Sequence, residues 1–96
     1  MNAKEILSFF RDDPALLEAF EGIARQRKIR LQDLLETLGM DKETTIENLH
    51  RLEDVGYIGS REAPGHLEDL RWYYLTSRGW AARIHVRKLH ELELVP

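Results

Sequence analysis

The segment DLLETLGMDKETTIENLHRLEDVGYI, residues 33–58, decides the fold of this 96-residue chain. Gly39 supplies the left-handed backbone conformation that ends a helix over residues 32–38. Asp41 has the side chain of a good N-cap for the helix that follows, and Gly56 ends that second helix. One face of the second helix is marked by residues at i, i+4 and i+7: Thr45, Leu49 and Leu52. The segment therefore predicts two helices joined by a tight turn.

A β-hairpin and a last helix are predicted downstream of this helix pair. Residues 57–61 and the aromatic run LRWYYL, residues 70–75, have the composition of strands. Residues 63–66, APGH, form a predicted turn, because Pro presets one backbone angle and Gly permits the other. Thr76 is placed to cap a helix that runs from about 77 to 92.

Two further helices are predicted upstream. Asn2 is the expected N-cap of the first, and Asp13-Pro14 ends it and begins a second helix that runs to about Gln26. Residues 29–31 are interpreted as a short connector. The predicted order is therefore four helices, two strands and a helix, in one domain over residues 1–96.

The sequence resembles the winged helix-turn-helix transcription regulators, a broad group that includes the MarR, ArsR and PadR families. The resemblance rests on Leu-Gly, then Leu-x-x-Leu-Glu-x-x-Gly-Tyr-Ile, then Leu-Thr-x-x-Gly, in that order between Asp33 and Gly79. It implies a mainly α fold with a small β-hairpin: a helix-turn-helix over about 31–56, a wing over about 57–75, an extra N-terminal helix and a C-terminal helix.

The resemblance also implies a homodimer bound to double-stranded DNA, with the helix over 41–55 in the major groove and the hairpin tip at a minor groove or the phosphates. The expected recognition-helix contacts are Lys42, Thr44, Asn48 and Arg51. The expected wing and backbone contacts are Arg61, His66, Arg71, Arg27 and Lys28. The alternative for the helix residues is a solvated face with ordinary capping.

The distribution of charge favours a second hypothesis as well. The net charge is −3, and Glu43 and Glu47 stand on the helix that is expected to meet phosphates. An acidic helix of this kind fits a winged-helix module that binds a basic protein surface. The basic run over residues 25–30 is interpreted either as a phosphate clamp or as cations that complement the end of a helix.

The last helix is apolar over more than one stripe, which favours a second buried side against a partner subunit. Its expected dimer-interface residues are Trp80, Ile84, Leu89 and Leu92. The aromatic residues Trp72, Tyr73, Tyr74 and Trp80 are open to two interpretations. They either line a ligand pocket or, more simply, supply buried area in the core and the interface.

Several function classes are not expected. The chain has no cysteine, which favours the cytoplasm, and we expect neither a signal peptide nor a membrane span. No nucleophile, phosphate loop or acid–base pair predicts an enzyme, and no cofactor is expected. Four histidines are present, but His85 and His90 are five residues apart, on different helix faces, so no metal site is predicted.

Overall fold

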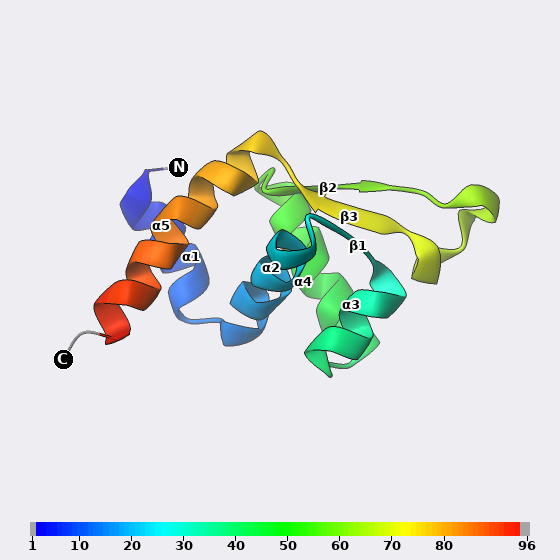
Figure 1. Cartoon of the computed structure of the whole chain (residues 1–96), viewed down its shortest axis with the longest axis horizontal. Coiled ribbons are helices and arrows are strands. Elements are labelled where there is room, and N and C mark those ends of the chain that lie inside the picture. The colour runs from blue at the N-terminus through cyan, green and yellow to red at the C-terminus, as the bar shows by residue number, and fades with distance from the viewer. Residues whose placement is uncertain (1, 95–96) are drawn as a thin grey trace.

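The computed structural model describes residues 2–94 and contains, within them, five α-helices and a three-stranded antiparallel sheet (Figure 1). The elements follow in the order α1 (Ala3–Arg11), α2 (Pro14–Gln26), β1 (Lys28–Arg30), α3 (Leu31–Leu38), α4 (Lys42–Asp54), β2 (Ile58–Arg61), β3 (Trp72–Leu75) and α5 (Ser77–Leu94). Two short 3₁₀ turns, η1 (Pro64–His66) and η2 (Glu68–Leu70), lie between β2 and β3. This is the mainly α winged-helix fold that the sequence predicts.

Polar side chains begin the helices where the sequence predicts it. The Asn2 side chain accepts a hydrogen bond from the backbone N–H of Glu5 at 2.9 Å, and Asp13 and Asp41 accept equivalent bonds at the starts of α2 and α4. These bonds satisfy backbone donors that have no partner inside a helix. Gly39 ends α3 with φ +66°, as expected for its left-handed position.

The sheet differs from the predicted hairpin by one strand. Its order is β1-β3-β2, so that β3 pairs with β2 in the wing and with β1 on its other side. Ile29 and Arg30, interpreted as part of a connector over 29–31, belong to β1 because Ile29 pairs with Tyr73 and both side chains are buried. A strand of three residues is too short for its alternation of buried and exposed side chains to be recognised, and its partner strand β3 lies in a distant segment. The strands of the wing are also shorter than predicted, because Leu70 belongs to η2.

The core lies between the helices and one face of the sheet. Phe10, Phe20 and Tyr57 are each at most 1% exposed and form a cluster of rings with centroids 4.9–6.0 Å apart. Each large aromatic side chain buries a wide apolar area, so this cluster joins α1, α2 and the start of the wing. The predicted inner face of α4 is confirmed, since Thr45, Leu49 and Leu52 are fully buried.

The two ends of the molecule have different characters (Figure 1). At one end α1 packs beside α5, and at the other lies the loop of the wing, whose η2 turn packs against α3. None of the helices within residues 2–94 has the length and apolarity needed to cross a membrane. Helix α4 lies between these ends, next to the wing.

A compact junction connects the end of α4 to the start of α5. The Thr76 hydroxyl donates to the backbone oxygen of Gly56 and accepts from the N–H of Gly79 at 3.1 Å, and the Thr76 N–H donates to Tyr57 O at 3.1 Å. A Cβ atom on Gly79 would lie 2.0 Å from the same Tyr57 oxygen. The Gly-Tyr motif and the Leu-Thr-x-x-Gly motif therefore contact each other directly at this junction.

Candidate nucleic-acid interface

The solvent-facing side of α4 is acidic. Glu43, Glu47, His50 and Asp54 follow one another at helical spacing, and all four are exposed. Asn48 does not share this side. It is 4% exposed and its amide nitrogen has no hydrogen-bond partner within the described residues. In this structure Asn48 is therefore not exposed for contact with bases.

The two cations of α4 are engaged by carboxylates of other elements. Lys42 Nζ lies 2.8 Å from Asp69 Oδ1 and 3.7 Å from Glu68 in η2. The Asp69 carboxylate raises the pKa of Lys42 above its ordinary value. Arg51 forms a hydrogen-bonded ion pair with Asp13, the N-cap of α2. Both cations of the predicted recognition set, Lys42 for the DNA backbone and Arg51 for base edges, thus already have anionic partners.

Thr44 completes the predicted recognition set. It is half-buried and its backbone N–H donates to Asp41 at 3.1 Å, which places it in the capping turn of α4. Thr44 thus serves the capping role of the alternative interpretation.

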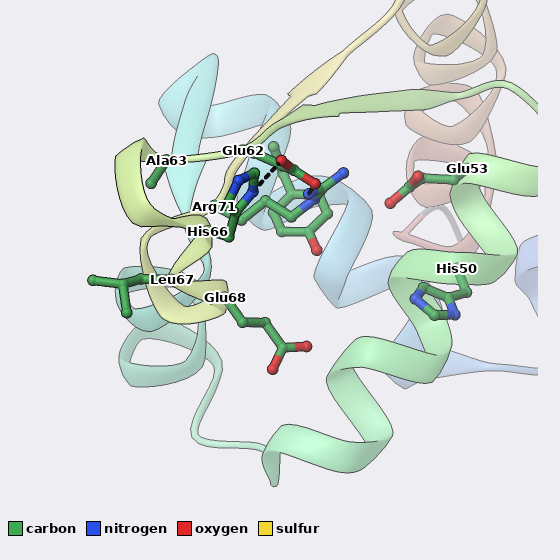
Figure 2. A pocket seen from close by; sticks show the side chains of 9 residues that line it. His50, Glu53, Glu62, Ala63, His66, Leu67, Glu68 and Arg71 are labelled. Atoms are coloured by element: carbon green, nitrogen blue, oxygen red, sulfur yellow. Dashed lines mark hydrogen bonds and ion pairs between the residues drawn. The ribbon is translucent and has the colours of Figure 1, made fainter.

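A cavity of about 260 Å³ separates α4 from the wing (Figure 2). His50 and Glu53 reach it from α4, and Glu62, His66 and Arg71 face them from the wing. The His66 Nδ1 atom lies 2.6 Å from a Glu62 carboxylate oxygen, and Arg71 lies 3.5 Å from the other oxygen. His66 holds the pKa of Glu62 below its ordinary value, with a smaller effect from Arg71.

We call the exposed side of α4 and the loop of the wing, residues 42–54 and 62–71, the α4–wing surface. These two segments contain seven acidic residues and three Lys or Arg residues. Their formal net charge is −4 with neutral histidines. The three cations are Lys42, Arg51 and Arg71, and each has a carboxylate within 4 Å. A surface of this charge repels phosphates unless the cations exchange their partners.

Two of the predicted wing and backbone contacts lie on a different surface. Lys28 of β1 and Arg61 of β2 are exposed and line a second cavity together with Trp72 and Tyr74 of β3. Arg71, by contrast, donates to Ser60 Oγ at 2.8 Å and 3.0 Å and faces the first cavity. The structure therefore divides the predicted cations between the two faces of the sheet.

The aromatic residues divide in the same way. Tyr73 is 4% exposed, and its burial raises the pKa of its hydroxyl. Trp72 and Tyr74 are only partly buried and lie on the opposite face of β3. Core packing thus accounts for Tyr73, and sequence reasoning missed the surface formed by its neighbours. Strand alternation over residues 72–74 was the signal for it.

Arg27 lies at the junction of α2 and β1. It is the C-cap residue of α2, is exposed, and has φ +67°, a conformation that is uncommon for a residue with a side chain. Its N–H donates to Ala24 O at 3.3 Å. The interpretation of this basic run as a helix ending agrees with that position.

The predicted dimer-interface residues on α5 are partly described. Ala82 and Val86 are buried against the core, whereas Trp80 and Ile84 are 39% and 60% exposed. Trp80 and Ile84 are one turn apart and form an apolar pair on the outer side of the helix. Leu89 and Leu92 lie outside the residues whose side chains the structure describes.

Among the side chains that the structure describes, those of residues 2–88, no three potential metal-ligating groups come together.

Comparison with known proteins finds neighbours of this fold among solved structures. No sequence-family model matches the chain, and no curated protein matches it. Its structural neighbours include a MarR structure at 25% identity and TM-score 0.76, covering 91% of this chain and 63% of the other. A mutant MarR from E. coli complexed with operator DNA is 22% identical with TM-score 0.72, covering 91% of this chain and 61% of that one.

TubR from Bacillus thuringiensis serovar israelensis pBtoxis, solved bound to 24 bp of tubC, is 14% identical with TM-score 0.75. That alignment covers 92% of this chain and 95% of TubR. The chain spans under two thirds of each MarR chain. The chain thus shares its fold with MarR proteins and with TubR.

Proposed function

We propose that this winged-helix chain is a transcription regulator that binds double-stranded DNA as a homodimer, with α4 in the major groove. The observation that carries the proposal is the exposed α4 beside a projecting wing. Two structural neighbours with this arrangement were solved on DNA, the mutant MarR and TubR. Fold does not fix function by itself, so the proposal must also assign contacts to residues.

The side chains available for these contacts differ from the recognition-helix contacts that the sequence predicts. Asn48 is buried, so base contacts from the middle of α4 fall to the exposed Glu47 and His50. A glutamate in the major groove accepts a hydrogen bond from the cytosine amino group. Lys42 and Arg51 flank them and contact phosphates once they release Asp69 and Asp13.

The partner subunit in this proposal is a second copy of the chain, held through α5. The side chains of Trp80 and Ile84 are exposed together, on the side of α5 that the core does not use. Burial of a large apolar side chain contributes roughly 1.5–3 kcal/mol. A twofold axis through this pair would relate the two α4 helices by symmetry, as a palindromic site requires.

The dimer is tested by light scattering coupled to size exclusion. Ile84→Glu should convert a dimer into a monomer, because it puts a charge in the centre of the apolar pair. Ser77→Glu is the matched control, since it adds the same charge to an exposed position of the same helix. A wild-type chain that stays monomeric at high concentration would refute the dimer.

A second candidate function is favoured by the ion pairs. Lys42, Arg51 and Arg71 are engaged by carboxylates, whereas no ion pair within the described residues engages Glu43, Glu47 or Asp54. A face of this kind complements a basic protein surface. In this alternative the winged helix is an interaction module and α4 is its acidic contact helix.

One experiment separates the two functions. Fluorescence anisotropy measures the affinity for a random-sequence DNA duplex as salt is raised, for the wild type and for Glu43→Lys/Glu47→Lys. If α4 enters DNA, the two lysines remove repulsion and add up to two phosphate contacts. The affinity rises, and the slope of log affinity against log salt steepens by up to about 1.8.

The matched control is Glu5→Lys/Glu18→Lys, which makes the same change in net charge on α1 and α2. An equal gain in the control and the α4 variant would refute the placement of α4 on DNA. No binding of the wild type and the α4 variant at low salt would refute the DNA function. A basic partner that the wild type binds and the α4 variant does not would then support the interaction module.

A further inference from the structure

The outer face of the sheet carries a row of aromatic rings between cations. Residues that point away from the core alternate with the buried Ile29, Ile58 and Tyr73 along the three strands. These outward residues are Lys28 and Arg30 on β1, Trp72 and Tyr74 on β3, and Gly59 and Arg61 on β2. Because β3 is the central strand, the two rings lie in the middle of the face, with cations on both edges.

The rings are held in place by their neighbours. The Arg30 guanidinium lies 4.7 Å from the centroid of the Trp72 ring, and Lys28 Nζ lies 5.2 Å from it. Gly59 is paired with Tyr74, and a Cβ atom at that glycine would lie 2.7 Å from the tyrosine ring. The Tyr74 ring therefore packs against β2 in a space that is open only because residue 59 is a glycine. Both rings remain partly exposed.

The charge of this face is the opposite of that of the α4–wing surface. Its outward residues include three cations and no acid. Lys28, Arg30 and Arg61 form no ion pair with any side chain that the structure describes, in residues 2–88, although the chain has a net charge of −3. An open cavity of about 400 Å³ is lined by Lys28, Arg61, Trp72 and Tyr74. The face thus offers uncompensated positive charge beside aromatic surface.

We propose that the outer face of the sheet binds a single-stranded nucleic acid. Base–aromatic stacking and a cationic track for the backbone are the two elements by which proteins hold single strands. Trp72 and Tyr74 are two residues apart on one strand, about 6.6 Å, so each ring can take a base of its own. The Arg30 guanidinium, stacked on Trp72, also offers a plane to a base.

A DNA duplex does not fit this face equally well, because its bases are stacked on one another and present no ring surface. The phosphates of a single strand, by contrast, can meet Arg30 or Lys28 on one edge and Arg61 on the other while its bases face β3. The site is separate from α4 and does not depend on the proposed duplex binding.

The test uses a fluorescent oligothymidylate and the full chain. We expect binding that weakens with salt, together with quenching of tryptophan emission that is absent in the variant Trp72→Ala. Lys28→Glu/Arg30→Glu should lower the affinity by about tenfold or more, since it reverses the charge on one edge. Trp72→Ala should lower it by about fivefold or more through lost stacking. Gly59→Ala, which displaces the Tyr74 ring, should also weaken binding.

The matched control for charge is Lys4→Glu/Arg11→Glu, which makes the same change on an exposed lysine and an exposed arginine of α1. It should retain most of the affinity, and circular dichroism confirms that each variant is folded. The proposal is overturned if the wild type does not bind, or if control and test variants lose affinity equally. It is also overturned if a duplex of equal length or polyglutamate competes as well as the single strand. The duplex assay with the α4 variant fails or succeeds independently of these results.

Discussion

The junction between the wing and α5 predicts a large effect of a single methyl group. In the variant Gly79→Ala, the new Cβ atom would lie 2.0 Å from the backbone oxygen of Tyr57. Contacts of this kind are not observed below 3.0 Å, so the two segments must separate by about 1 Å. The hydrogen bond from the Thr76 N–H to the same oxygen, 3.1 Å long, then lengthens beyond a useful distance.

The cost follows from the groups that lose their partners. A buried carbonyl without its hydrogen bond costs roughly 1–3 kcal/mol. Disruption of the Thr76 cap at the start of α5 costs about 1 kcal/mol more. We therefore expect Gly79→Ala to lower the free energy of unfolding by about 2–4 kcal/mol, a large part of the typical stability of a domain.

The assay is urea unfolding followed by circular dichroism, with Gly39→Ala as the matched control. Gly39 has φ +66° and no atom within 4 Å of the position of a Cβ, so its substitution costs only backbone strain, about 1–2 kcal/mol. If Gly79→Ala costs no more than Gly39→Ala, the close contact at Tyr57 does not exist in solution, and the explanation of the Leu-Thr-x-x-Gly motif is incorrect.

Three further predictions concern side chains that the structure pairs or leaves unpaired. Asp13→Asn keeps a capping side chain on α2 but loses the ion pair with Arg51, which lowers the pKa of Asp13 from its ordinary 3.8. A lowered pKa stabilises the fold above the ordinary value, and this contribution is lost as pH falls below it. The stability difference between wild type and variant in urea should therefore hold between pH 7 and about 5 and shrink as pH falls below about 4, and a difference that stays constant below pH 4 would contradict it. Asn48→Leu should raise the free energy of unfolding by about 1 kcal/mol, because it removes a buried amide nitrogen without a partner. It should leave the affinity for duplex DNA unchanged, and a loss of affinity would restore Asn48 as a DNA contact. Lys42→Met should not measurably change the urea midpoint, since its ion pair with Asp69 is exposed, and a clear loss would assign the pair a structural role.

Local signals in the sequence were sufficient for the helices. Asp13, Asp41 and Gly39 act on neighbouring backbone groups, and each does in the structure what its residue type predicts. The buried face of α4 followed from its period in the same way. These features could be predicted because cause and effect lie within a few residues.

The functional surfaces required information that the sequence pattern does not contain. In the sequence, Lys42 and Arg51 have the charge expected of DNA contacts. In the structure, however, they are paired with Asp69 and Asp13 from distant segments. The outer face of the sheet was missed for a related reason. Lys28 and Tyr74 lie on one face only because β1 pairs with β3. A strand of three residues is too short for this pairing to be recognised from the sequence.

The position of β3 in the middle of the sheet has a consequence for how the chain folds during synthesis. Residues 72–75 are the last strand to leave the ribosome, yet β1 and β2 can pair only through them. Until then both earlier strands keep unpaired edges. A nascent chain arrested before residue 72 should therefore be susceptible to proteolysis at both β1 and β2, and should become protected in one step once β3 has emerged.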